Sequence, residues 1–393
     1  MEKTKVKTLV RQIRGVSYKP EDLHNELDDN SVVLLRANNI DEGKINFDDV
    51  VYVDKSKVSD EQYLKYGDIL ICASSGSKNL VGKAASIRFN TECTFGAFCK
   101  VIRPKEGLDE YLSVYFQSPI YRRKISEVAI GVNINNIRNE HIDELDIPVF
   151  LNDEQASIVK KIHLIQEVIS NRKAELEKLD DLIKARFVEM FGNPDINEKK
   201  WNEYKMEQLC EVGSSKRIYQ NDQSITGIPF LRISDLVNRM DTGSKGCDLF
   251  IPEELFGKLK KQGLVPVRGD ILLTARGTLG RCYIIQDEDE FYFQDGMITW
   301  LSKYDERITP LYISYLFEMP GFRKQIDSLQ AGSTVAYLSI SMTKKLNVMT
   351  PPIELQNQFA DFVRAVDKSK VAVQKTLEQT QTLFDSLMQK YFG

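Results

Sequence analysis

The sequence repeats one pattern about 200 residues further along the chain. The tetrapeptide Gly-Asp-Ile-Leu begins at Gly67 and again at Gly269, an offset of 202 residues. Other matches follow in the same order at offsets of 201 to 203: Gly131 with Gly332, Pro148 with Pro351, Gln155 with Gln358, and Phe191-Gly192 with Phe392-Gly393. Solenoid repeats have periods of about 20 to 50 residues, so each copy here is a whole domain. The sequence predicts a protein with an internal twofold relationship, and a target with the same duplication.

Length and composition predict a soluble globular protein. The 393 residues are 42% hydrophobic and 28% charged, which is enough for two or three folded domains. The longest apolar runs are about as long as a strand, and the start of the chain lacks the apolar stretch of a signal peptide. Six scattered cysteines without a Cys-x-x-Cys pair favour free thiols over a metal site. We expect a cytoplasmic protein without a bound metal.

The charge is unevenly distributed. A net charge of -4 argues against a polyanionic partner. However, residues 63–105 carry seven basic and two acidic side chains, and the corresponding residues 256–285 carry six and one. Any single cluster is explained by a solvated mixed surface. Its recurrence around the same motif favours two sites that face a polyanion such as DNA.

The front part of each copy is predicted to be an α+β domain. Short apolar runs such as residues 32–35, 50–53, 69–72, 271–273 and 291–293 are broken by turn-forming residues, which is typical of strands. Residues 109–117 and 310–317 have the pattern of brief helices.

The rear part of each copy has apolar residues at alternating steps of four and three, the heptad pattern of a coiled-coil helix. In the first copy these are Ile158, Ile162, Ile165, Ile169, Leu176, Leu179, Ile183 and Met190. In the second they are Phe359, Val363, Val366, Val373, Leu377, Phe384, Leu387 and Tyr391. Each helix of some 35 residues would be roughly 50 Å long. We expect the two helices to pair in an antiparallel intramolecular coiled coil with one domain at each end.

Two other arrangements of these helices remain open, a helical hairpin within one core and homodimerisation through the seams. Arg172, Arg186, Lys370 and Thr380 interrupt the heptads. We interpret them as solvated edge positions, with a role in register or partner binding as the alternative.

Catalytic motifs are not evident in the sequence. Residues 76–84 resemble a phosphate-binding loop, but five residues separate the glycines instead of four, and Ala84 replaces the magnesium-binding hydroxyl. The motifs of dinucleotide-binding proteins, α/β-hydrolases, zinc proteases and amino-methyltransferases are lacking. Asp68 and Asp270 are expected to be turn residues. The chain is predicted to bind a partner and not to be an enzyme.

The loops after Gly-Asp-Ile-Leu contain residues that hydrogen-bond to bases and phosphates. The first loop has Ser-Lys-Asn at residues 77–79 where we expect the second to have Arg-Gly-Thr at 276–278. A repeated frame with different polar residues predicts one scaffold that reads two sequences, although divergence by drift gives the same pattern. The residues that we predict to contact DNA are Arg36, Asn38, Asn39, Ser75, Ser77, Lys78, Asn79, Lys83, Asn133, Arg232, Ser234, Arg276, Thr278, Arg281, Ser333, Thr334 and Tyr337.

Several segments resemble the specificity subunit of Type I restriction-modification enzymes. They are LLRANNI at 34–40, both Gly-Asp-Ile-Leu loops, GSTVAYLSI at 332–340, Pro351-Pro352 before a heptad helix, and MFGNP at 190–194 followed by Trp201. The sequence departs from the family in two segments: Ser339-Ile340-Ser341-Met342 stands where an Asn-Lys pair is common, and Ile147-Pro148-Val149-Phe150 lacks the usual double proline. Trp201 belongs to the segment at the start of the second copy, which we call the lead-in segment, and the first copy has no evident counterpart of it.

The resemblance implies two target recognition domains, residues 1–149 and 193–351, joined by conserved helices at 150–192 and 352–393. Each domain would read half of a split, asymmetric site on double-stranded DNA. The implied partners are two modification subunits, which use S-adenosylmethionine to methylate adenine, and restriction subunits, which use ATP and magnesium. The chain itself would bind no cofactor. The alternatives are a recognition subunit of a related Type II system, a scaffold protein that does not bind DNA, and a nuclease or methyltransferase.

Overall fold

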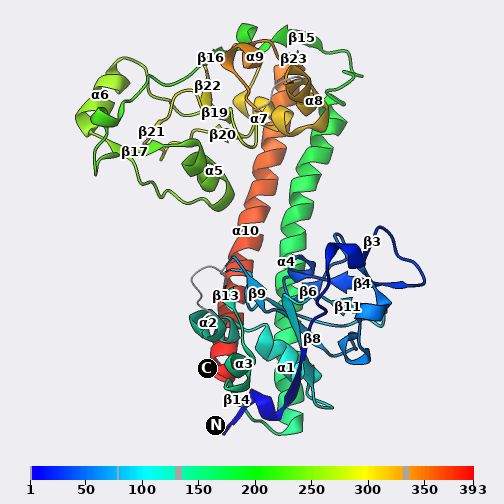
Figure 1. Ribbon diagram of the computed structural model, residues 1–393. Coiled ribbons are helices and arrows are strands. Elements are labelled where there is room, and N and C mark those ends of the chain that lie inside the picture. The colour runs from blue at the N-terminus through cyan, green and yellow to red at the C-terminus, as the bar shows by residue number, and fades with distance from the viewer. Residues whose placement is uncertain (1, 78, 129–134, 331–335) are drawn as a thin grey trace. The chain divides into compact units, whose positions relative to one another are not determined.

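The computed structural model describes residues 2–77, 79–128, 135–330 and 336–393, which form two compact units (Figure 1). Unit 1 comprises Met1–Ala174 with Gln374–Gly393, and unit 2 comprises Glu175–Val373. The border between the units falls within two long helices, α4 (Asn152–Phe191) and α10 (Ile353–Phe392), so that each unit contains part of both.

Each unit is built around a four-stranded antiparallel sheet with the same strand order. In unit 1 the order is β10 (Ala84–Ser86), β8 (Ile69–Cys72), β12 (Cys99–Pro104), β2 (Val10–Arg14). In unit 2 it is β20 (Cys282–Ile284), β19 (Ile271–Thr274), β22 (Ile298–Ser302), β16 (Glu211–Gly213). The Ile-Leu of each Gly-Asp-Ile-Leu motif therefore begins a buried inner strand, as the sequence predicts.

A second sheet in each unit contains one parallel pair. In unit 1 it consists of β11 (Cys93–Phe95), β4 (Ser31–Leu35), β7 (Val51–Asp54) and β3 (Leu23–His24), with β11 parallel to β4. In unit 2 it consists of β18 (Phe250–Ile251), β17 (Ile228–Leu231) and β21 (Tyr292–Phe293), with β21 parallel to β17. Both copies thus share one α+β fold, which confirms the predicted fold class.

Shorter elements complete the two units. The helices are α1 (Asp109–Phe116), α2 (Pro119–Val128) and α3 (Asn139–Asp143) in unit 1, and α5 (Ile233–Thr242), α6 (Glu253–Lys261), α7 (Pro310–Glu318), α8 (Pro320–Leu329) and α9 (Ile340–Lys344) in unit 2. The strand pairs are β1 (Lys3–Lys5) with β14 (Asp146–Pro148), β5 (Ile40–Asp41) with β6 (Lys44–Ile45), β9 (Ser74–Ser75) with β13 (Asn135–Asn136), and β15 (Asn202–Lys205) with β23 (Asn347–Thr350). The 3-10 turns are at Val6–Thr8, Pro20–Asp22, Ala37–Asn39, Lys55–Lys57, Asp60–Gln62, Met206–Gln208 and Gln220–Asp222.

The lead-in segment, expected only in the second copy, occurs in both. β1 pairs with β14 as β15 pairs with β23, and a 3-10 turn follows each lead-in strand. The backbone N–H of Val6 donates to Leu145 O and that of Met206 to Leu346 O, both at 2.9 Å. Our expectation was wrong because pairing of the lead-in strand does not depend on the Trp201 side chain.

In both units α4 and α10 run in opposite directions and pack through apolar side chains, among them residues of the predicted heptads. In unit 1, Ile158 and Ile162 of α4 lie in one buried cluster with Phe384 and Phe392 of α10. In unit 2, Phe187 of α4 packs edge-on against Phe359 of α10, with ring centroids 5.5 Å apart. These apolar contacts stabilise the helix pair in each unit, since burial of one such side chain contributes about 1.5–3 kcal/mol.

Two residues that interrupt the heptads are not solvated edges as expected, because they join the helices within unit 2. The guanidinium of Arg186 on α4 lies 5.6 Å from the ring centroid of Phe362 on α10. Lys370 on α10 forms an ion pair with Asp180 on α4. These two basic side chains thus add contacts between the helices to those of the apolar seam. Among the described residues, no helix is both long enough and apolar enough to span a membrane.

Candidate nucleic-acid interface

Each unit carries a polar loop directly after the inner strand that contains its Gly-Asp-Ile-Leu motif. We call residues 73–82 of unit 1 loop A and residues 275–280 of unit 2 loop B. Loop A connects β8 to β10 and loop B connects β19 to β20. Loop A is four residues longer and contains Lys78, which lies outside the described residues.

The two loops close with the same backbone hydrogen bonds. The N–H of Cys72 donates to Lys83 O at 2.9 Å, and that of Thr274 donates to Arg281 O at 3.0 Å. Lys83 and Arg281 therefore occupy equivalent positions, each a half-buried cation where the chain leaves its loop. The equivalence follows from the hydrogen bonds and not from the number of residues in the loop.

Glycine is required at the end of both loops. Gly82 has φ +81° and Gly280 has φ +73°, a backbone conformation that residues other than glycine rarely adopt. A Cβ atom at Gly82 would also lie 2.7 Å from Cγ2 of Ile125 on α2, and one at Gly280 would lie 3.1 Å from Cδ1 of Ile326 on α8. The close approach of each loop to a helix fixes the position of the loop on that helix.

An arginine from the supporting helix holds each loop. The guanidinium of Arg122 on α2 donates to the carbonyl oxygens of Val81 and Asn79, the latter at 2.9 Å. Arg323 on α8 donates from Nη1 to the carbonyl oxygen of Leu279 at 2.9 Å. Sequence reasoning missed both arginines, although their offset of 201 residues places them in the repeat.

A second segment pairs with the start of each loop. The carbonyl of Ala73 accepts the N–H of Ile137 at 2.8 Å, and that of Ala275 accepts the N–H of Leu338 at 2.9 Å. Consequently Ser74, which pairs with Asn136 through β9 and β13, corresponds to Arg276, which pairs with Tyr337 in an isolated bridge. The expected match of residues 77–79 with 276–278 is therefore wrong, because the four extra residues of loop A come after this pairing.

Arg276 is exposed and lies on an aromatic platform. Its guanidinium carbon is 5.1 Å from the centroid of the Tyr337 ring, the distance of a cation–π contact. Among the described residues, no carboxylate forms an ion pair with Arg276. The contact orients the guanidinium while its hydrogen-bond donors stay available.

Arg36 and Arg232 occupy equivalent positions at the ends of β4 and β17, and both are paired with acids. Arg36 donates from Nη2 to Asp49 Oδ2 at 2.9 Å. Arg232 donates from Nε to Asp235 Oδ2 at 3.0 Å and from Nη2 to Asp248 Oδ2 at 3.1 Å. These carboxylates hold the guanidinium groups and take up part of their donor capacity.

Asn39 is placed differently from the prediction that it contacts DNA directly. Its side chain is 0% exposed, and its Oδ1 accepts the backbone N–H of Arg36 at 2.8 Å. Asn39 therefore shapes the 3-10 turn by binding the backbone N–H of the residue that precedes it, and asparagine side chains often make such local hydrogen bonds to the backbone. The neighbouring Asn38 is exposed and donates to Asp49 Oδ2 at 2.9 Å.

The remaining predicted residues lie at or near the surface, or outside the described residues. Ser77, Asn79, Ser234 and Thr278 are exposed, and Ser75 is half-buried. Arg281 donates to Asp241 Oδ1 at 2.6 Å, and this contact lowers the pKa of Asp241. Lys78, Asn133, Ser333 and Thr334 lie outside the described residues.

A polar groove in unit 2 brings together two of the predicted arginines. It has a volume of about 460 Å³, and Arg232 and Arg276 both line it. Its other polar side chains are those of Arg217, Gln223, Gln294 and Asp295, which sequence reasoning missed. The first copy has different residues at the matching positions, such as Ser17 for Arg217 and Ala97 for Asp295, so the repeat gave no signal for them.

Much of the positive charge of residues 63–105 does not form the polyanion-facing patch that we expected. Arg103 forms an ion pair with Asp68 at 2.7 Å, in which the side chains are 18% and 1% exposed. Lys100 is buried against Asn139, and desolvation lowers its pKa. Arg88 is held by two acids of α1. These cations serve the fold of unit 1.

The aspartates of the repeated motif are turn residues, as expected. Asp68 Oδ2 accepts the N–H of Lys65 at 2.8 Å, and Asp270 Oδ2 accepts the N–H of Val267 at 2.9 Å. Asp270 also accepts the indole N–H of Trp300 at 2.8 Å, and burial raises its pKa.

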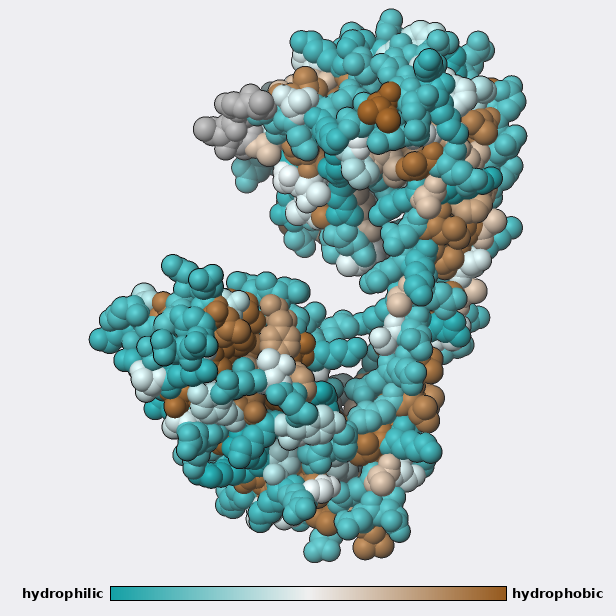
Figure 2. All heavy atoms as spheres, turned by 90° about the vertical axis from the view of Figure 1, so that its right-hand side faces the viewer, coloured by the Kyte–Doolittle hydropathy of each residue, from teal (hydrophilic) through white to brown (hydrophobic). Residues whose placement is uncertain are grey.

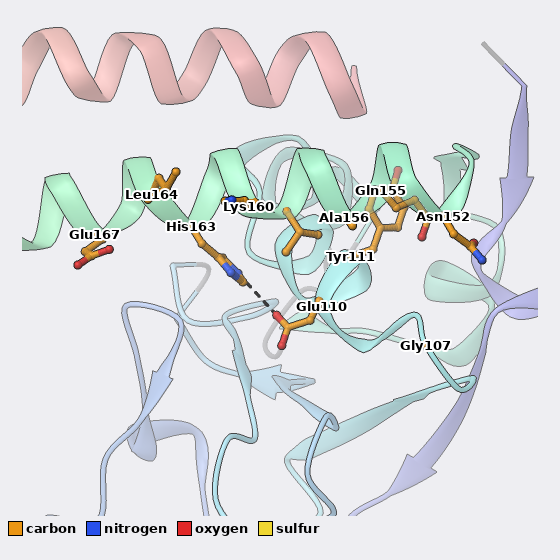
Figure 3. A pocket seen from close by; sticks show the side chains of 11 residues that line it. Gly107, Glu110, Tyr111, Asn152, Gln155, Ala156, Lys160, His163, Leu164 and Glu167 are labelled. Atoms are coloured by element: carbon orange, nitrogen blue, oxygen red, sulfur yellow. Dashed lines mark ion pairs between the residues drawn. The ribbon is translucent and has the colours of Figure 1, made fainter.

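A second groove in unit 1 lies between α4 and the start of α1, with a volume of about 530 Å³ (Figure 3). His163 on α4 points toward Glu110 on α1, with Nε2 3.7 Å from Oε2. None of the predicted DNA contacts within the described ranges lines this groove. Figure 2 shows a mainly hydrophilic surface in which apolar side chains gather in smaller patches.

Comparison with known proteins places this architecture in one family. The model of the Type I restriction modification DNA specificity domain matches twice, at residues 18–179 and 198–380. The Type I restriction enzyme EcoKI specificity subunit of Escherichia coli K12 is 30% identical over 420 residues, covering 98% of this chain and 87% of that protein. The StySPI specificity subunit of Salmonella potsdam is 40% identical over 180 residues, covering 46% and 39%.

Two solved structures share the fold. The Type I restriction-modification S subunit from M. genitalium has a TM-score of 0.52 and 16% identity, covering 100% of this chain and 96% of that one. A chain from a structure on complex assembly and conformational transition of the type I R-M system has a TM-score of 0.57 and 15% identity, covering 100% and 97%.

Two repeated α+β units that each match a DNA specificity domain define a DNA-recognition protein. The chain belongs to the family of Type I restriction-modification specificity subunits. Its function is to supply the DNA specificity of such a system, and neither the Type II alternative nor the scaffold alternative is favoured.

Proposed function

We propose that unit 1 and unit 2 each read one half of a bipartite, asymmetric site on double-stranded DNA. This proposal rests on the observation that the two units share the same backbone arrangement around loops A and B but carry different side chains there. Ser74 stands where the other unit has Arg276, and Asn136 where it has Tyr337. One scaffold with different donors and acceptors reads different base edges in the major groove.

The proposed contacts fall into two groups. Arg276 and the polar side chains of loops A and B face bases, together with Asn38, Ser234 and Tyr337. Lys83, Arg281, Arg36 and Arg232 position the duplex through its phosphates, because cations at loop ends bind the backbone without regard to sequence. Lys78, Asn133, Ser333 and Thr334 join the first group on sequence grounds, and Asn39 acts by holding Arg36.

We further propose that the conserved helices set the spacer between the half-sites and dock two modification subunits. The recognition domains are then residues 1–149 and 193–351, and the helices are residues 150–192 and 352–393. Support comes from the continuity of α4 and α10 across the border between the units, and from the buried seam in each unit.

In this proposal the chemistry belongs to partner subunits in the cytoplasm. Modification subunits flip the target adenine into their own pocket and methylate it with S-adenosylmethionine. Restriction subunits use ATP and magnesium to translocate and cut. Support comes from the sequence of the chain, which lacks the motif of amino-methyltransferases.

Selection from a random DNA library tests the proposal. The full chain with its modification subunit is expected to enrich two short, unlike sequences at a fixed separation. Substituting Ser74→Ala should alter only one of the two halves, and Tyr337→Phe only the other. Enrichment of one continuous sequence, or of none at moderate salt, would refute bipartite reading.

A further inference from the structure

An arginine of unit 2 that has no arginine as its counterpart in unit 1 is held in place at the wall of the polar groove. Arg217 follows β16 in the chain and donates from Nε to Asp295 Oδ2 at 2.8 Å. The Asp295 side chain is only 20% exposed, whereas that of Arg217 is 65% exposed. A largely buried carboxylate thus anchors an arginine whose outer end faces solvent, and the contact raises the pKa of Arg217.

The anchor leaves the two outer nitrogens of Arg217 unoccupied. Nε is bound to Asp295, and among the described residues neither Nη1 nor Nη2 has a hydrogen-bond partner. Arg232 in the same groove differs, because its Nε and its Nη2 both donate to carboxylates. Arg217 therefore presents a fixed pair of parallel donors, the geometry that matches two acceptors on one edge of a ligand.

The surroundings of Arg217 are polar and fixed by the backbone. Gln223 and Gln294 line the groove beside it, and the backbone N–H of Gln294 donates to Leu231 O at 2.9 Å. Asp295 follows Gln294 directly, so the anchor is tied to the end of β17. Carboxamides beside a guanidinium are typical of surfaces that read base edges and not phosphates alone.

In the described part of unit 1, the positions that match Arg217 and Asp295 hold no such pair. The turn after β2 is closed by Lys19 and Asp22 as the turn after β16 is closed by Tyr219 and Asp222, which sets an offset of 200. Ser17 therefore stands at the position of Arg217.

The anchor is also lacking in unit 1. Gly96 and Gln294 make the same backbone hydrogen bond, to Leu35 O and Leu231 O, and Ala97 follows where unit 2 has Asp295. The difference is confined to the surface of the shared frame, as expected of a residue that sets specificity.

We propose that Arg217 reads a guanine in the half-site of unit 2, with Asp295 as its positioning residue. Nη1 and Nη2 donate to O6 and N7 of the guanine in the major groove. This inference rests on the proposed function and adds to it a specific base and the side chain that reads it.

The test uses the full chain with its modification subunit and a DNA library randomised in both half-sites. Arg217→Ala should reduce the preference for guanine at one position of the unit 2 half-site about 5- to 150-fold, the discrimination that one bidentate pair supplies. Arg217→Lys should lose most of that preference, since an ammonium lacks the planar fork. Asp295→Asn should weaken it while the chain still binds.

Arg268→Ala is the matched control. Arg268 is also an exposed arginine of unit 2 paired with an aspartate, Asp287, but it does not line the groove. Its loss should leave every base preference unchanged. All variants should keep the preferences of the unit 1 half-site, which also shows that they fold.

Three outcomes would overturn the inference. They are a unit 2 half-site without guanine, unchanged preferences in Arg217→Ala, or uniform weakening with a smaller salt dependence, which marks a phosphate contact. Failure of the unaltered chain to select two half-sites refutes the proposed function instead, so the two failures are distinguishable.

Discussion

Removing one heptad from both α4 and α10 should shorten the spacer of the recognised site. The ion pair between Asp180 and Lys370 marks one level of the helix pair. A deletion of residues 171–177 ends three residues before Asp180, and a deletion of residues 373–379 begins three residues after Lys370, so both lie on the same side of that level. Seven residues correspond to roughly 10 Å of helix, or up to about 3 base pairs at about 3.4 Å each. The deletion turns each helix by only about 20° relative to the heptad seam, so the apolar faces still meet.

The assay is library selection with the variant and its modification subunit, which reports both half-sites and their separation. We expect unchanged half-sites, a spacer shorter by one to about three base pairs, and weaker binding, because about three base pairs also turn the duplex by roughly a quarter to a third of a turn. Val371→Ala, at a position that is 69% exposed in the neighbouring heptad, should leave the spacer unchanged. An unchanged spacer in the deletion variant would refute the role of the helices.

Three further predictions concern loop B and the two aspartates of the repeated motif. Arg276→Ala should weaken specific binding by about 1–3 kcal/mol if the side chain reads a guanine, whereas a smaller salt slope alone would mark a phosphate contact. Asp68→Asn should destabilise the protein by about 3 kcal/mol, because it leaves the largely buried Arg103 unpaired, and chemical denaturation measures this. Asp270→Asn keeps an oxygen for both hydrogen bonds, so stability near neutral pH should stay equal or rise. Since burial raises the pKa of Asp270, its contribution to stability is present at acidic pH and lost as pH rises through that pKa, and thermal unfolding of the Asp270→Asn variant should be less sensitive to pH there.

The fold was largely predictable because the repeat and the spacing of apolar residues indicate the strands and helices that the structure contains. The Ile-Leu of each Gly-Asp-Ile-Leu forms a buried strand, and the heptads form α4 and α10. The lead-in strand of the first copy escaped notice because backbone pairing, unlike a tryptophan, leaves no mark in the sequence.

The site was less predictable because its geometry depends on tertiary hydrogen bonds. Matching the loops by sequence failed because loop A has four extra residues. Ser74 and Arg276 are shown to be equivalent only by the backbone pairing inside each unit, of Ser74 with Asn136 and of Arg276 with Tyr337. Asn39 is of a residue type that often contacts bases, but its side chain binds the backbone of a turn. Arg217 gave no signal, because what distinguishes it is an aspartate that lies 78 residues away in the sequence.

Sequencing of methylated bases in the genome of cells that carry this chain with its modification subunit tests most directly whether the two units read two unlike half-sites. We expect methylated adenines within one asymmetric motif that has two different specific halves and a spacer of constant length and arbitrary sequence. A motif with identical halves, or a continuous motif without a spacer, would contradict reading by two units with different polar loops.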